Sequence, residues 1–153
     1  MSRFTPKLSS GLYIALALVA VAAACHRYPP VGLSPESFRA ATSGADWTLT
    51  EIAGRPAPMG EAGRPATLRF DSDSARVSGF GGCNRYFGSY TMELTALRFG
   101  SLGMTKMACV EGMALEQQLA TALDSTRSYK LSANTLVLRG DNGPLATFTR
   151  PTP

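Results

Sequence analysis

The sequence predicts an α+β domain, in which a twisted antiparallel sheet or partial barrel packs against one amphipathic helix. From residue 45 onward, short runs of alternating apolar and polar residues are separated by turn-forming residues, which is typical of antiparallel strands. Residues 111–125 alone carry apolar side chains at helical spacing. Strand patterns flank this helix on both sides in the sequence, so we expect it to cover a sheet built from both groups.

Strands are expected wherever apolar residues alternate between turns. In ATLRF (66–70), for example, Leu68 and Phe70 fall on one face of a half-buried strand. DSDS (71–74) and DNG (141–143) are expected turns, because Asp, Ser and Asn side chains bond nearby backbone and Gly tolerates positive φ. The predicted strands are 47–52, 66–70, 76–78, 84–92, 96–99, 128–131, 135–139 and 145–149.

The predicted helix has one apolar and one polar side. Helical spacing places on the apolar side Leu115, Leu119, Ala122 and Leu123, and we expect Met113 to join them. The same spacing places on the polar side Glu116, Gln117, Thr121 and Asp124. The apolar side is therefore expected to pack on the sheet.

Residues 1–24 have the anatomy of a secretory signal peptide. Arg3 and Lys7 supply the positive charge, and residues 11–24 are continuously apolar or small. This run is shorter than the roughly 20 residues that a bilayer span requires. We therefore expect a leader that is removed on export, with an uncleaved signal anchor as an alternative.

Ala22-Ala23-Ala24-Cys25 resembles a bacterial lipobox, with Ala22 in the place where Leu is usual. The resemblance implies that the leader is cut before Cys25 and that Cys25 receives fatty acyl chains, palmitate among them. Acylation of this kind anchors a protein to a membrane. The alternative is an ordinary leader-peptidase site after Ala24, which would leave a soluble periplasmic or secreted protein.

Residues 25–44 are interpreted as the lipid-attachment cysteine and a flexible linker, because they contain three prolines and no periodic apolar pattern. Residues 45–150 then form one domain, long enough for a single core. We expect a lipoprotein that faces the periplasm. Since His26 and not Asp follows the cysteine, the outer membrane is favoured over the inner membrane.

The charge balance gives little support to a nucleic-acid partner. The formal net charge is +4, but Arg3 and Lys7 of the leader supply two of those charges. No Lys/Arg run occurs in the remaining chain. We therefore expect no nucleic-acid partner, and a monomer held at the membrane by its lipid.

Two segments carry the densest local signals, VSGFGGCNRYFGSY (77–90) and GSLGMTKMAC (100–109). With the Trp and Leu of the first strand and TLVL (135–138), they resemble the META domain, the HslJ-like family of bacterial heat-shock and envelope proteins, over residues 45–150. The residues that we take as family motif, structural or binding, are Trp47, Gly79, Gly82, Asn84, Arg85, Gly88, Tyr90, Thr105 and Met107.

The resemblance implies a small α+β domain linked to the heat-shock response, and in some members to antibiotic tolerance or secretion. It supplies no catalytic residues. We expect a non-enzymatic envelope lipoprotein that supports stress or antibiotic tolerance by binding a protein or an envelope component. The alternatives are a hydrolase or inhibitor module directed at cell wall or peptides, and a carrier of small lipophilic ligands.

If Cys25 is lipidated, Cys83 and Cys109 remain as a pair in an oxidising compartment, which predicts a disulfide. The alternative is two free buried thiols. The only histidine of the chain, His26, lies outside the domain, so no Cys–His dyad or Ser–His–Asp triad is expected there. Two cysteines alone do not make a zinc site. We expect no catalytic residue, no metal and no cofactor.

Other side chains near the motif admit two interpretations. Met104, Met107 and Met113 are expected to fill the core near the start of the helix, with a metal site or an adaptable binding groove as the alternative. Phe80, Tyr86 and Phe87 form either a binding face or alternately buried positions of a strand. The glycines at 79, 81 and 82 predict a turn or bulge and not a phosphate loop, because a strand follows them.

Overall fold

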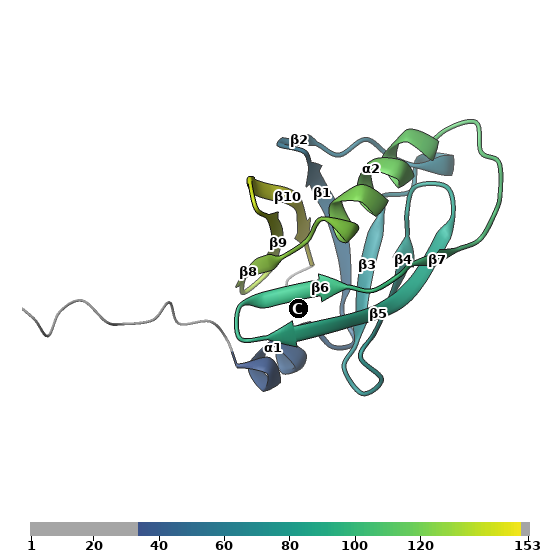
Figure 1. Ribbon diagram of the computed structural model, residues 1–153. Coiled ribbons are helices and arrows are strands. Elements are labelled where there is room, and N and C mark those ends of the chain that lie inside the picture. Colours follow the sequence, from purple (N-terminus) through teal and green to yellow (C-terminus); the bar gives the residue numbers. More distant parts are fainter. Residues whose placement is uncertain (1–33, 151–153) are drawn as a thin grey trace, which may run out of the picture. The chain divides into compact units, whose positions relative to one another are not determined.

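The sheet of this protein closes on itself into an antiparallel barrel (Figure 1). The computed structural model describes residues 34–150, so the predicted leader and Cys25 lie outside the described residues. Eight strands pair in the order β10-β9-β8-β6-β5-β4-β3-β1, and β10 pairs again with β1. Their bounds are β1 Asp46–Ile52, β3 Thr67–Asp71, β4 Arg76–Phe80, β5 Arg85–Glu93, β6 Ala96–Phe99, β8 Ser128–Ser132, β9 Thr135–Gly140 and β10 Gly143–Thr149.

Shorter elements decorate this barrel. Strand β2, Arg55–Pro56, pairs with β1, and β7, Gly103–Met104, pairs with β5. A 3-10 turn, η1, spans Glu61–Gly63. The α-helices of the described residues are α1, Pro35–Thr42, and α2, Met113–Asp124.

The predicted α+β class with an open or partial sheet is wrong, because the domain is mostly β and its barrel is closed. All eight predicted strands are present, with ends displaced by two residues at most. Closure depends on the pairing of β1 with β10, in which Leu49 lies opposite Phe148. The first and last strands of the barrel thereby satisfy each other's edge hydrogen bonds, and an open edge is avoided.

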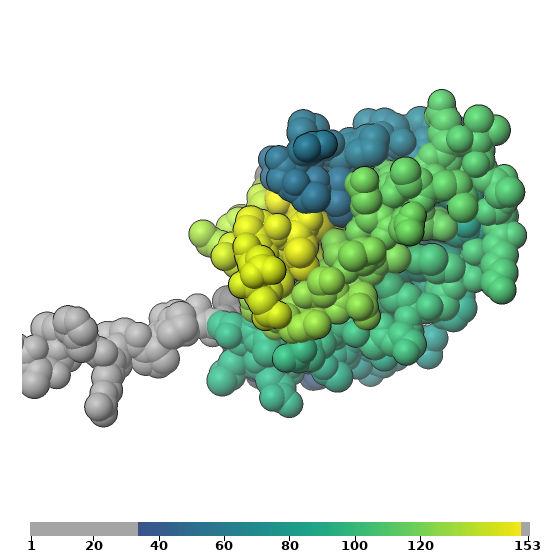
Figure 2. Space-filling view, turned by 45° about the horizontal axis from the view of Figure 1, so that its top comes forward, coloured from purple at the N-terminus to yellow at the C-terminus, as the bar shows by residue number. Residues whose placement is uncertain are grey.

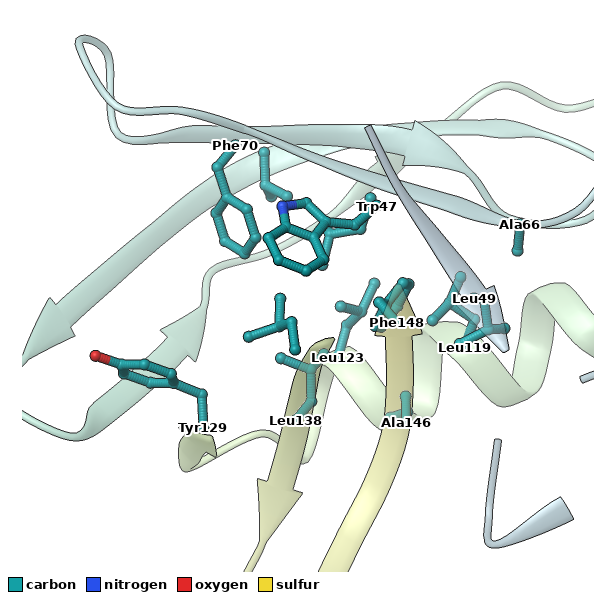
Figure 3. Packing of buried hydrophobic residues seen from close by; sticks show 14 of the residues in the cluster. Trp47, Leu49, Ala66, Phe70, Leu119, Leu123, Tyr129, Leu138, Ala146 and Phe148 are labelled. Atoms are coloured by element: carbon teal, nitrogen blue, oxygen red, sulfur yellow. The ribbon is translucent and has the colours of Figure 1, made fainter. Parts of the chain in front are cut away.

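Side chains fill the inside of the barrel. Alternate residues of each strand point inward, and Trp47, Phe70, Leu138 and Phe148 are each at most 1% exposed there (Figure 3). Phe70 packs edge-on against Tyr90, with ring centroids 5.1 Å apart. An eight-stranded barrel is just wide enough for side chains to fill. The interior is therefore the hydrophobic core.

Helix α1 belongs to the folded domain, although we interpreted its residues as part of a linker. Pro35 occupies the first turn, and the Ser34 hydroxyl caps the helix by accepting from the N–H of Ser37 at 3.2 Å. Phe38 is fully buried, with its ring 5.3 Å from Phe70 and 4.6 Å from Tyr129 between centroids. Phe38 therefore attaches α1 to the core, and the Arg150 guanidinium adds a hydrogen bond to the Ala41 carbonyl at 2.7 Å.

Helix α2 packs against β1, β6, β9 and β10 through the side predicted from the sequence. The four expected apolar side chains, Leu115, Leu119, Ala122 and Leu123, are buried. Two other positions differ from the prediction, because Glu116 is buried and Met113 is 48% exposed. No helix within residues 34–150 has the length and apolar character needed to cross a bilayer.

Candidate functional site

Three glycines bring distant segments together at one end of β5. The N–H of Glu61 donates to the Gly82 carbonyl at 2.7 Å. A Cβ atom on Gly60 or Gly112 would lie only 2.4 Å or 2.1 Å from that same carbonyl oxygen. Gly82 and Gly112 also have positive φ, at 125° and 84°. Only glycine permits this backbone contact, which we call the glycine junction.

A disulfide between Cys83 and Cys109 lies beside the glycine junction, with an S–S distance of 2.04 Å and a Cα–Cα distance of 5.8 Å. The disulfide predicted from the cysteine count is thereby confirmed. It joins residues 26 positions apart. A cross-link over a loop of this length stabilises a domain by about 2–4 kcal/mol. It ties the turn before β5 to the segment that leads into α2.

The Asn84 side chain holds that segment from inside. Its Oδ1 accepts from the N–H of Met107 at 2.7 Å and from the Thr105 hydroxyl at 2.9 Å. Its Nδ2 donates to the Met107 carbonyl at 3.2 Å. Asn84 itself is only 3% exposed, and the three hydrogen bonds are partly buried. The amide therefore pairs with the Met107 backbone as a neighbouring strand would.

Glu116 connects Asn84 to helix α2. Its Oε1 accepts from Asn84 Nδ2 at 3.1 Å, and its Oε2 accepts from the Asn84 backbone N–H. Sequence reasoning placed Glu116 on the polar side of the helix and missed this role. The available signal was its position next to Leu115 and three residues before Leu119, at the border of the apolar stripe. A buried carboxylate of this kind requires hydrogen-bond partners.

Most other motif residues serve the core or close backbone packing. Trp47 is fully buried, with the Arg150 guanidinium 5.1 Å from its ring centroid. Tyr90 is buried against Phe70, and burial raises the pKa of its hydroxyl. A Cβ on Gly79 would meet the Thr67 carbonyl at 2.0 Å. These residues therefore fix the barrel and offer no reactive group.

Two further motif residues lie beside β7. A Cβ on Gly88 would meet a Leu102 side-chain carbon at 2.7 Å, so this glycine lets the chain before β7 pack closely on β5. The backbone of Arg85 is bonded on both sides by Thr105: its N–H donates to the Thr105 hydroxyl at 3.2 Å, and its carbonyl accepts from the Thr105 N–H at 3.1 Å. The Arg85 residue itself is exposed.

Exposed apolar side chains lie close in the sequence to the glycines and the disulfide of this site. Val110 is 99% exposed, Met107 63%, Met59 61% and Met113 48%. We call these four residues the tip patch. Each of the four lies within two residues of Gly60, Cys109 or Gly112 in the sequence. Figure 2 shows that the segment before α2 (green) lies beside the segment after β2 (blue). The prediction that Met107 and Met113 fill the core is therefore wrong, whereas Met104 does pack against the core.

A model of the META domain family matches residues 40–152. The chain belongs to the META domain family. This membership confirms the resemblance seen in the two motif segments, and the matched range includes every motif residue discussed above. A search of curated proteins finds no match for this META domain protein.

Solved structures share the META fold of this chain. The NMR structure of a protein from Burkholderia xenovorans is 32% identical, with a TM-score of 0.60, and the match covers 83% of this chain and 94% of that one. A second NMR structure is 23% identical with a TM-score of 0.58, over 76% and 94% of the two chains. A DUF4847 family protein from Bacteroides vulgatus is 13% identical with a TM-score of 0.52, over 73% and 96%.

The META domain brings few reactive side chains together. Within residues 34–150, no three His, Cys, Asp or Glu side chains are grouped so that they could hold a metal ion. Both cysteines of this range are engaged in the disulfide. The site at this end of the barrel therefore offers exposed apolar side chains on a fixed backbone, and its buried polar groups hold that backbone in place.

Proposed function

We propose that this META domain protein is a non-enzymatic envelope lipoprotein that binds a protein partner through the tip patch and thereby supports stress or antibiotic tolerance. The leader and the lipobox-like Ala22–Cys25 segment support membrane attachment through Cys25. The disulfide supports maturation in an oxidising compartment, where such bonds persist. The periplasmic side of the outer membrane is the proposed location.

The tip patch carries the proposal. Large apolar side chains that stay exposed together commonly mark interaction surfaces. Methionine side chains adapt to varied partners because they are flexible and polarisable. The backbone beneath Met107 and Val110 is held by the disulfide and by Asn84. A surface that is already ordered loses less conformational entropy on binding.

Two alternative functions have less support in the structure. A hydrolase that used a cysteine nucleophile would need a thiolate, whereas Cys83 and Cys109 are bonded to each other. Large side chains such as Trp47 and Phe148 occupy the barrel interior, so the interior has no room for a lipophilic ligand. A binding role at the outer surface is consistent with both observations.

Photo-crosslinking in living cells tests the proposal. A photoreactive amino acid is placed at Val110 in the patch, and separately at Leu94 as the matched control. Leu94 is 70% exposed and apolar, and it follows the far end of the nine-residue strand β5, roughly 30 Å from the disulfide. We expect a discrete protein adduct from position 110 and none from position 94.

A second variant separates binding from folding. Met59→Gln together with Met113→Gln removes apolar surface at exposed positions and should leave the unfolding midpoint unchanged. The adduct formed from position 110 should then weaken severalfold. Equal adducts from positions 110 and 94, or an adduct unaffected by the two glutamines, would contradict the proposed role of the tip patch.

A further inference from the structure

A groove of about 660 Å³ lies on the outer surface of the barrel, over β3, β4 and β5. The strand register places Arg69, Ser78 and Phe87 side by side across these three strands. The residue in the middle, Ser78, is small, so the long side chains of Arg69 and Phe87 rise on either side of it. The volume is within the range typical of small-molecule sites.

Positive charge dominates the lining of this groove. Arg64, Arg69 and Arg85 line it together with the single carboxylate of Asp46, which gives a net charge of +2. Arg69 and Asp46 form an ion pair at 3.0 Å, the only one found within residues 34–150, and their side chains are 51% and 67% exposed. An exposed pair of this kind is weak and exchanges readily. An anionic ligand that binds Arg69 therefore has to displace only this weak ion pair, which solvent already screens.

The other two arginines are positioned by neighbouring groups. The Arg64 guanidinium lies 4.0 Å from the centroid of the Phe80 ring. Stacking of this type orients the planar cation and leaves its N–H edge available. Arg85 is exposed, while its backbone is bonded on both sides by Thr105. Two guanidinium groups thus rise from fixed backbone positions beside the groove floor.

We propose that this groove binds the phosphate group of a small ligand. A phosphate monoester carries a charge of about −1.5 to −2 at pH 7, which matches the net charge of the lining. Guanidinium groups form paired hydrogen bonds with phosphate oxygens. Phe87 is 50% exposed at the groove, where its ring can flank an apolar part of the same ligand. This site is separate from the tip patch, and its test is independent of the proposed function.

Titration with phenyl phosphate tests the groove, because this probe combines a phosphate with an aromatic ring. The full chain is held in dodecyl maltoside micelles, and backbone amide NMR signals of Ser78, Gly79 and Phe87 are followed. We expect saturable shifts of these signals with phenyl phosphate, weaker binding with inorganic phosphate, and no binding with uncharged phenol.

Variants of the groove test which residues hold the phosphate. Arg64→Gln and Arg85→Gln should each weaken the binding of phenyl phosphate at least about fivefold, because each removes a charged donor. Arg98→Gln, on the exposed face of β6 outside the groove, should have no effect.

A second series separates a soluble ligand from a lipid headgroup. The same micelles are doped with phosphatidylglycerol, or with phosphatidylcholine as the control without net charge. Shifts produced by phosphatidylglycerol and removed by Arg85→Gln assign the groove to lipid headgroups, whereas shifts confined to phenyl phosphate assign it to soluble phosphates. If neither probe produces saturable shifts, or if the two arginine variants bind as the wild type does, the proposed site is overturned.

Discussion

The carboxylate of Glu116 accepts hydrogen bonds from both the backbone and the side-chain amide of Asn84, so helix α2 is fastened to the turn that begins β5. Asn84 in turn holds Thr105 and Met107. One buried pair of side chains therefore connects the glycine junction, the segment before α2 and the helix itself.

Glu116→Ala should destabilise the protein by about 2–3 kcal/mol, because it leaves two buried N–H donors of Asn84 without an acceptor. Glu116→Gln keeps the shape and one acceptor, so its cost should be smaller. Gln117→Ala, at the exposed neighbouring position, is the matched control. Urea unfolding of the three variants measures the differences. Equal unfolding midpoints for Glu116→Ala and Gln117→Ala would show that the Asn84 contact contributes nothing.

Gly112→Ala should cost about 2–4 kcal/mol. The new Cβ would lie 2.1 Å from the Gly82 carbonyl oxygen, in addition to the strain of a φ of +84°. Gly44→Ala is the control, since Gly44 has a similar φ of +72° but no atom within 4 Å of an added Cβ. The loss of stability in this control measures the strain of a positive φ alone, which is about 1 kcal/mol. Thermal unfolding compares the two, and an equal loss of stability would argue against the close contact at the junction.

Phe38→Ala should lower the free energy of unfolding by about 3–5 kcal/mol, because it empties a fully buried position. The result matters because Phe38 lies in residues that we interpreted as a linker. Phe87→Ala is the control, with half of its surface already exposed. Denaturant titration measures both variants. If Phe38→Ala were as stable as Phe87→Ala, helix α1 would not be part of the folded domain.

The unfolding free energy should fall as the pH rises above about 10. Burial raises the pKa of Tyr86 well above its ordinary value of 10.0, so the unfolded chain loses this proton first. The contribution of Tyr86 to stability is fully present below the pKa that this tyrosine has in the unfolded chain. It is lost progressively as the pH rises above that value. Tyr86→Phe removes the hydrogen bond to the Thr67 carbonyl, at a cost of about 1 kcal/mol near pH 7.

The diagnostic result for Tyr86 is the slope of stability against pH. Above pH 10 the Tyr86→Phe curve should fall less steeply than the wild-type curve. A remaining slope is expected, because burial also raises the pKa of Tyr90 and Tyr129. Parallel curves for the two proteins would contradict the burial of the Tyr86 hydroxyl.

Local patterns in the sequence predicted the elements but not how they assemble. Alternation and helical spacing are properties of neighbouring residues, and they located eight strands and α2. Barrel closure joins residues far apart, as where the Thr50 hydroxyl donates to the Thr147 carbonyl, 97 positions away. No local pattern encodes that pairing. Helix α1 was missed because Phe38 is its one large apolar core residue, and one residue establishes no period.

Some features of the site could likewise be predicted from local sequence, whereas others depend on contacts between distant residues. The disulfide followed from cysteine count and compartment, and the motif segments indicated Asn84, Thr105 and Met107. The exposure of the tip patch could not be predicted, because methionine is usually placed in a core by its hydrophobicity. Met59 and Met113 are exposed beside Gly60 and Gly112, whose close backbone contacts form only in the folded chain.

The mass of the intact protein, extracted from the membranes of cells that express it, tests the central claim of an exported lipoprotein with an oxidised cysteine pair. We predict a chain that begins at Cys25, carries the added mass of fatty acyl groups and lacks two hydrogens because Cys83 is bonded to Cys109. A full-length chain in the soluble fraction, with all three cysteines open to alkylation, would contradict it.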